Sequence, residues 1–284
     1  MKGIDSAAPL TAQAAQILAE SGIRFSGRYL VPTYGGTNWK ALTADEATHI
    51  LDAGLALLLV WETDAARAKG GAAAGATDGA RARQLAQDMG VPAGTTIFFA
   101  VDYCPDAGEY GIIAEYLKAA DMACGEYVAG VYGSYFVVEA MAERHACTKF
   151  WQCVAWSSGK VSEKLHVYQY QWQGGAEAMA VGQKIGIKVD MNSCEDLEAA
   201  GLWMRQEEPQ EDEGKEEVKR YNTVAEIEAG APWAVPTIQK LISTGCIQGK
   251  GSATDADGNP ADMDLSMDMI RVFVIHDRAG LYPD

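Results

Sequence analysis

The chain has 284 residues, 48% of them hydrophobic, and a formal net charge of −16 at pH 7. It is long enough to bury one or two cores, and it contains no apolar run of roughly 18 residues that would cross a membrane. The acidic excess and the lack of a basic stripe argue against nucleic acid as a partner and against attraction to an anionic membrane through net charge.

Eight short apolar segments are predicted to be β-strands. They alternate with segments of helical character, and this order predicts a parallel sheet with crossover helices. Eight strands within roughly 200 residues fit a (β/α)8 TIM-like barrel better than an open sheet, and no glycine-rich nucleotide fingerprint follows any strand. The strands are expected at residues 3–5, 24–30, 56–62, 96–102, 127–132, 150–156, 166–172 and 184–190.

Capping signals locate the helices between these strands. Thr43 and Glu46 fit a capping box at the start of one helix. Another helix is predicted over residues 77–89, and a last one over 193–203 with its N-cap at Ser193. The connections after the sixth and seventh strands are too short or too polar for full helices. We therefore expect an incomplete ring of helices around the barrel.

The composition changes sharply after Arg205. Residues 206–220 contain seven acids and a single aliphatic side chain, which predicts a solvated linker over 205–220, or alternatively an acidic interaction tail. The predicted domains are a barrel over 1–204 and a small, mainly α-helical domain over 221–284. In the latter, one helix ends at Gly245 and a second begins after Ser266, with a Gly- and Asp-rich loop between them.

Four predicted strands end in a carboxylate: Asp5, Glu62, Asp102 and Asp190. The C-terminal ends of the strands form the active-site face of such a barrel, so these side chains are expected to lie together. Mutual repulsion raises at least one pKa in a cluster of acids, and this supplies the proton donor that glycoside hydrolysis needs beside an ionised carboxylate. Structural roles stay open, as helix caps for Asp5 and Asp190 and as a loop start for Glu62.

Aromatic and polar residues near the same strand ends are candidates for substrate binding. Sugar rings stack on aromatic faces, although most aromatic side chains serve in packing. A polar residue inside an apolar strand could bind substrate, orient a carboxylate or form a structural pair. The candidates are Arg28, Tyr29, Trp61, Tyr132, Trp151, Gln169 and Trp172.

Metal ions and organic cofactors are not expected. The six cysteines show no regular spacing, and none of the four histidines has a second histidine at ligand spacing. We expect reduced cysteines, mostly buried as small hydrophobic residues. An enzyme that cleaves an amide bond of the cell wall would use zinc or a Cys/His pair. Only Cys104 and His166 would support that alternative.

Several motifs in one order carry a resemblance to a known family. They include GIDSA at 3–7, GVPAGTTIFFAVD at 90–102, GVYGSY at 130–135 and VDMN at 189–192. The stretch 3–203 resembles the glycoside-hydrolase-like barrel related to family 25 lysozymes, which is common in phage endolysins. The resemblance implies muramidase-type hydrolysis of bacterial peptidoglycan.

The sequence departs from this family at the usual proton donor. Family 25 lysozymes carry Asp-x-Glu after the fourth strand, whereas this chain has Asp102-Tyr103-Cys104. Glu62 is therefore the candidate general acid, Asp102 the base or electrostatic stabiliser, and Asp5 and Asp190 the residues that hold substrate. The missing glutamate leaves a non-catalytic glycan-binding barrel as the alternative.

The C-terminal segment resembles a single divergent surface-layer-homology repeat. The run WAVPTIQKLISTGCIQGKG at 233–251 carries the resemblance, while the family's Thr-Arg-Ala-Glu stretch is replaced by residues 265–268. It implies a module that binds a cell-wall polymer or forms a homo-oligomer. The chain passes from Met1 and Lys2 directly into the first strand, so no signal peptide is expected. An endolysin of this kind would be made in the host cytoplasm and act on the wall after release.

Overall fold

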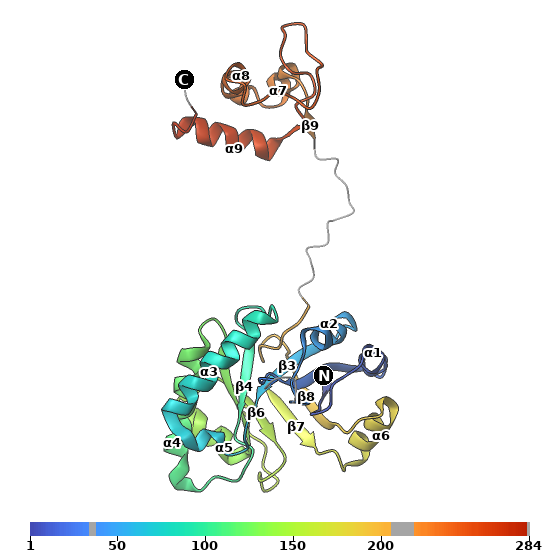
Figure 1. Ribbon diagram of the computed structural model, residues 1–284, viewed down its shortest axis with the longest axis vertical. Helices are drawn as coiled ribbons and strands as arrows, with labels where there is room; N and C mark the ends of the chain where they lie inside the picture. Colours follow the sequence, from blue (N-terminus) through green and yellow to red (C-terminus); the bar gives the residue numbers. More distant parts are fainter. Residues whose placement is uncertain (34–37, 206–218, 283–284) are drawn as a thin grey trace. The chain divides into compact units, whose positions relative to one another are not determined.

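The computed structural model describes residues 1–33, 38–205 and 219–282 (Figure 1). The chain forms two compact units, Met1–Gln206 and Glu207–Asp284, and each is described by itself. Most of the predicted acidic linker, residues 206–218, lies outside the described residues. Among the helices that are described, none is both long and apolar enough to cross a membrane.

Eight strands of the first unit form a closed barrel in the order β1 to β8, which confirms the predicted fold. Each strand from β1 to β6 pairs in parallel with the next one. The eighth strand is antiparallel to both of its neighbours. The strands are β1 (Lys2–Asp5), β2 (Ile23–Tyr29), β3 (Ala56–Trp61), β4 (Thr96–Ala100), β5 (Val128–Gly133), β6 (Lys149–Cys153), β7 (Val167–Gln171) and β8 (Asp190–Cys194).

The last strand corrects a prediction. The strand expected over 184–190 is wrong, because a helix extends to Ile185 and Gly186 ends it in the left-handed conformation with φ 75°. The strand begins only at Asp190 and runs in the opposite direction. An antiparallel strand that starts with an acid delivers it to the same end of the barrel as a parallel strand that finishes with one. Asp190 therefore lies at the predicted end of the barrel, although the strand predicted to carry it there is wrong.

Helices cover much of the outside of the barrel (Figure 1). Thr43 caps the second helix as predicted, since its side chain accepts a hydrogen bond from the Glu46 backbone N–H. The described residues form no helix between β6 and β7, as expected, but a helix does follow β7, against expectation. The helix predicted over 193–203 is also wrong, because Ser193 lies in β8 and residues 197–201 form turns. The helices are α1 (Ala12–Glu20), α2 (Ala44–Asp52), α3 (Gly71–Asp88), α4 (Tyr110–Cys124), α5 (Tyr135–Glu143) and α6 (Ala176–Ile185), with short 3-10 helices at Arg67–Gly70 and Ala107–Glu109.

Side chains of the strands alternate between two cores. In β3, Leu58 and Val60 pack inside the barrel, whereas Leu59 and Trp61 pack outside it, against the helices. This alternation with period two is the ordinary geometry of a strand. It decides which strand residues can reach a site at the end of the barrel.

Helices α3 and α4 pack closely because two glycines of α3, Gly75 and Gly79, lie against the backbone of α4. A Cβ atom at Gly79 would lie 2.4 Å from the carbonyl oxygen of Ala120. Gly79→Ala is therefore expected to lower the free energy of unfolding by about 1–3 kcal/mol through overpacking, measured by denaturant unfolding. Gly111→Ala on α4, where the Cβ position is open, is the control and should leave stability unchanged or raise it. Equal losses in both variants would contradict this account of the packing.

The second unit contains three α-helices and a two-stranded antiparallel sheet among its described residues. Ser266 caps the last helix, as predicted. The first of the three helices corrects the predicted two-helix module, and its signal was a Thr-x-x-Glu sequence at its start. Thr223 is the N-cap and accepts from the Glu226 N–H, while the Glu226 carboxylate accepts from the N–H of Asn222, the residue before the cap. The elements are β9 (Arg220–Tyr221), α7 (Val224–Gly230), a 3-10 helix (Pro232–Ala234), α8 (Val235–Ser243), β10 (Leu265–Ser266) and α9 (Met267–Arg278).

Candidate active site

Four acidic side chains meet at the end of the barrel where the parallel strands end. Asp5 is the last residue of β1, Glu62 follows β3 directly, and Asp102 lies two residues after β4. Asp190, the first residue of β8, pairs with Asp5. Burial raises the pKa of the Tyr29 phenol at the end of β2, and the charges of all four acids raise it further. The four side chains, which we call the carboxylate cluster, therefore lie near Tyr29 at one end of the barrel.

Two side-chain amides hold Asp5 in place. Its Oδ2 atom accepts hydrogen bonds from Nε2 of Gln169 at 2.8 Å and from Nδ2 of Asn192 at 2.7 Å. The same Gln169 nitrogen donates to Oδ2 of Asp190 at 3.2 Å. One amide group thus bridges two acids of the cluster.

Tyr132 and Trp151 fix the orientation of these amides. The Tyr132 hydroxyl donates to Oε1 of Gln169 at 2.9 Å, and Nε1 of Trp151 donates to Oδ1 of Asn192 at 2.9 Å. An indole N–H can only donate, so the oxygen of Asn192 must face Trp151 and its NH2 group must face Asp5. Both aromatic residues lie inside the barrel, where their rings pack edge to face with centroids 4.6 Å apart.

Burial raises the pKa of every acid in the carboxylate cluster. The pKa of Asp190 is raised to about 7 by burial and then by the charge of Asp5. Burial also raises the pKa of Asp5, against the effect of its two amide donors. For Glu62 burial acts first and the charge of Asp102 second, and burial likewise raises the pKa of Asp102. The cluster therefore favours a state in which at least one carboxyl keeps its proton.

Lys40 opposes these shifts from the loop that follows β2. Its Nζ lies 3.8 Å from Oε1 of Glu62 and 4.9 Å from the centre of the Tyr29 ring. Its charge lowers the pKa of both Glu62 and Asp102. Lys40 was missed in the sequence, because a lysine in a loop carries no periodic signal.

Removing this charge is expected to change the titration of the cluster. In Lys40→Met the pKa of Glu62 and that of Asp102 should both rise, because only the opposing cation is lost. NMR titration of the carboxyl carbons measures this, and any rate profile limited by a protonated Glu62 should extend to higher pH. Lys118→Met, on α4, is the control. Titration curves that stay the same in Lys40→Met would contradict the assigned role of Lys40.

The structure corrects three of the predicted substrate-binding residues. Arg28 is fully buried and faces the helices, where its Nε pairs with Oε1 of Glu46 at 2.6 Å. Trp61 is only 1% exposed and packs outside the barrel against Phe99. Trp151 is only 2% exposed and supports the cluster from inside the barrel. None of these three side chains reaches solvent at the site.

The other four candidates differ in their positions. Tyr132 and Gln169 belong to the buried network behind Asp5. Trp172 follows β7 and is 62% exposed, whereas Tyr29 is half-buried beside the carboxylate cluster. Whether these residues bind substrate stays a prediction.

A hollow of about 530 Å³ borders the carboxylate cluster on the side of Asp5 and Asp190. We call it the Trp39 hollow, after a tryptophan that is 63% exposed and was missed in the sequence. The only signal for Trp39 was its place in a loop after a barrel strand, where sites of this fold are built. The lining residues are Asp5, Ser6, Ala7, Ala8, Tyr29, Trp39, Gln173, Gly186, Ile187, Lys188, Val189 and Asp190.

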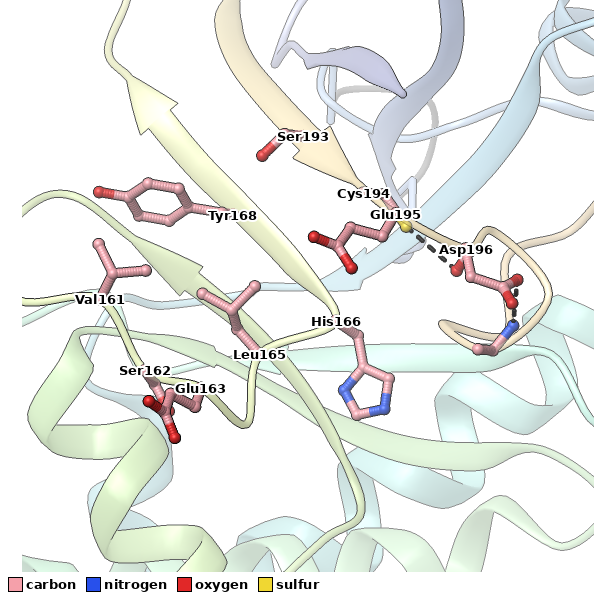
Figure 2. A pocket seen from close by; sticks show the side chains of 11 residues that line it. Val161, Ser162, Glu163, Leu165, His166, Tyr168, Ser193, Cys194, Glu195 and Asp196 are labelled. Carbon is pink, nitrogen blue, oxygen red and sulfur yellow. Dashed lines mark hydrogen bonds between the residues drawn. The ribbon is translucent and has the colours of Figure 1, made fainter.

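A second pocket, of about 480 Å³, is lined by His166 and Cys194 among others (Figure 2). It lies at the opposite end of the barrel from the carboxylate cluster. His166 precedes the parallel strand β7, and Cys194 ends the antiparallel strand β8, so both lie far from the carboxylate cluster. Nδ1 of His166 accepts the Phe150 backbone N–H at 3.3 Å. Cys104 follows β4 at the other end, so the Cys/His pair of the amidase alternative is not assembled.

Cysteine, histidine and carboxylate side chains are the usual metal ligands of proteins. All six cysteines lie within the described residues and are free, with Cys124, Cys153 and Cys194 buried and Cys104 and Cys246 exposed. In the described parts of the chain, no three or more His, Cys, Asp or Glu side chains are grouped so that they could hold a metal ion.

Comparison with known proteins identifies the family of the barrel. Residues 16–197, more than half of the chain, match the Rv2525c-like, glycoside hydrolase-like domain. The chain belongs to this family. The matched segment contains β2 to β7 and reaches past the end of β8, so it includes three of the four acids of the carboxylate cluster.

The curated relatives of this glycoside hydrolase-like protein match it over only part of their own length. Two uncharacterized proteins of Bacillus subtilis are similar to it: YbfG is 35% identical over 151 residues and FadG is 28% identical over 215 residues. These matches cover 45% and 69% of this chain, but only 20% of YbfG and 36% of FadG. The Tat-secreted protein Rv2525c of Mycobacterium tuberculosis, crystallised with L-tartrate, has the same fold, with a TM-score of 0.60 and 23% identity over 71% of this chain and 98% of that one.

Proposed function

We propose that the barrel hydrolyses the glycan strand of bacterial peptidoglycan, in the manner of a muramidase. The observation that carries the proposal is the carboxylate cluster, in which burial raises the pKa of every acid and the charge of a neighbouring acid raises it further at Asp5, Glu62 and Asp190. Glycoside hydrolysis needs a protonated carboxyl and an ionised one on either side of the bond. The family of the chain and the motif resemblance to family 25 lysozymes support the same reaction.

In this proposal Glu62 is the proton donor. It gives its proton to the glycosidic oxygen as the bond to the anomeric carbon breaks, and Asp102 stabilises the positive charge at that carbon or directs the water. Glu62 suits the role because it lies at the rim, 15% exposed, whereas Asp190 is already engaged with the Gln169 amide. Asp5 and Asp190 orient the substrate at the floor of the site.

A barrel that binds glycan without cutting it is the second candidate. It is favoured by Cys104, which stands where family 25 lysozymes have their glutamate. The two functions separate in one comparison: Asp102→Asn should abolish cleavage of the wall in the first case, while both candidates predict that the variant still binds the wall.

We also propose that the second unit attaches the protein to a cell-wall polymer or to a second copy of the chain. The resemblance to a surface-layer-homology repeat supports this, as do Met269, Val272 and Ile275, which are exposed along α9. In the endolysin reading, the protein would act on the wall after release from the cytoplasm of the host cell. Sedimentation of the full chain with and without purified walls tests both modes of attachment.

Product analysis of digested Gram-positive peptidoglycan tests the reaction itself. The proposal predicts new reducing sugar ends and no new free amines, identified by mass spectrometry of the released fragments. Free amines alone would mean that an amide bond is cut. If neither product forms while the protein stays bound to the wall, the non-catalytic candidate is correct.

A further inference from the structure

The Trp39 hollow has walls that are fixed to one another before any ligand arrives. The Ser6 hydroxyl donates to the Lys188 carbonyl at 3.0 Å and accepts the Ala8 N–H at 3.0 Å. These bonds join the loop after β1 to the segment that leads into β8. A hollow whose walls are already held by hydrogen bonds loses little conformational entropy when it binds a ligand.

A buried ion pair fixes the remaining wall. Arg28 donates to the Ser6 carbonyl and, at 3.1 Å, to the Lys40 carbonyl, next to Trp39 in the chain. Its partner Glu46 also accepts the Leu10 N–H at 2.7 Å. The pair thus holds the loops after β1 and β2 at once. Arg28 and Glu46 are positioning residues for the hollow, and they do not touch its contents.

The lining has the chemistry of an aminosugar site. Trp39 offers an exposed aromatic face, on which the C–H groups of a sugar ring can pack. Ala7, Ala8 and Ile187 are small or aliphatic and partly exposed. Such residues suit a methyl group, which a plain sugar lacks and a 2-acetamido sugar carries.

The charges of the hollow select among such sugars. Two carboxyls, Asp5 and Asp190, and one ammonium group, Lys188, belong to its lining. The whole chain is strongly acidic. An uncharged sugar therefore fits this lining better than one that carries a carboxylate or a phosphate.

We propose that the Trp39 hollow binds one uncharged N-acetylhexosamine of the glycan, with its ring on Trp39 and its acetamido methyl group against Ala7, Ala8 and Ile187. This inference rests on the proposed function, because it takes the glycan as the substrate. It adds which sugar occupies the space beside Asp5 and Asp190. The sugar that carries an anionic substituent must then lie on the far side of the bond that is cut.

Binding of two uncharged trisaccharides to the full chain tests the proposal. Triacetylchitotriose carries the 2-acetamido group and cellotriose carries a hydroxyl in its place. Titration followed by NMR should show triacetylchitotriose binding about tenfold or more tightly than cellotriose, since a buried methyl-sized group contributes at that level. Trp39→Ala should weaken triacetylchitotriose binding by about tenfold. Trp156→Ala is the matched control, because Trp156 is an exposed tryptophan that does not line the hollow.

The outcomes separate this proposal from the proposed function. Equal binding of the two trisaccharides, or an unchanged affinity in Trp39→Ala, would overturn the assignment of the hollow even if the wall is still cut. Absence of binding together with cleavage of the wall would also overturn the assignment and leave the hydrolase intact. Absence of both would overturn the two together.

Discussion

Glu62→Gln should slow cleavage of the natural glycan by about 10²–10⁴-fold, the usual contribution of a general acid. The same variant should cleave an aryl glycoside of an acidic phenol almost as well as the wild type does. The natural leaving group is a poor one that needs the proton, whereas the phenolate leaves without it. Rates on both substrates, measured for the same preparations, test this selective loss.

Two further variants sharpen the result. Glu198→Gln removes an exposed acid from the opposite end of the barrel and should change neither rate. If Asp190→Asn shows the selective loss and Glu62→Gln does not, the proton donor is Asp190 and the assignment of Glu62 is wrong. In either case the rate should fall as pH rises through the pKa of the donor, and burial moves that fall to higher pH because it raises the pKa of both acids.

Arg28→Ala should lower the free energy of unfolding of the barrel by about 3–5 kcal/mol, because it leaves the buried carboxylate of Glu46 without its partner. Both side chains are almost fully buried, at 0% and 4% exposure, and the Nε–Oε1 distance is 2.6 Å. Glu46→Ala should cost about as much, since it leaves the guanidinium unpaired instead. Denaturant unfolding of the full chain, followed by a signal from the barrel, measures both losses.

A double replacement separates stability from positioning. Arg28→Met combined with Glu46→Leu removes both charges, and should recover much of the lost stability because no unpaired charge remains buried. In the double variant the carbonyls of Ser6 and Lys40 still lose their hydrogen-bond donor. Its affinity for sugar in the Trp39 hollow should therefore be lower than that of the wild type. A stable double variant with wild-type sugar affinity would contradict the positioning role.

The sequence reveals the positions of the acids because they depend on local rules. An apolar run that ends in Asp5 or Asp102 can be recognised as a strand with an acid at its end, and barrel topology then brings such ends together. Asp190 reaches the same end through an antiparallel strand, which a run of residues does not reveal. Asp190 was expected at this end of the barrel because a parallel strand was predicted over 184–190, and the structure has no strand over 184–189.

The binding residues were harder to predict for a physical reason. A polar or aromatic residue in a strand that is buried on both faces gives no sign of which face it occupies, so Arg28 and Trp61 were assigned to the site although both face the helices. Trp39 lies in a loop, where no periodicity marks it. Asn192 lies 187 residues after Asp5 in the chain and supports it only because β8 closes the barrel beside β1. Contacts of that range require the folded structure.

The most direct measurement counts new reducing ends in purified peptidoglycan after digestion by the wild type and by Asp102→Asn, with wall-bound protein kept equal in the two samples. The account predicts reducing ends from the wild type and a loss of about 10²-fold or more in the variant. Equal release by the two proteins would show that the carboxylate cluster is not the catalytic site. No release by either would show that the barrel holds the glycan without cutting it.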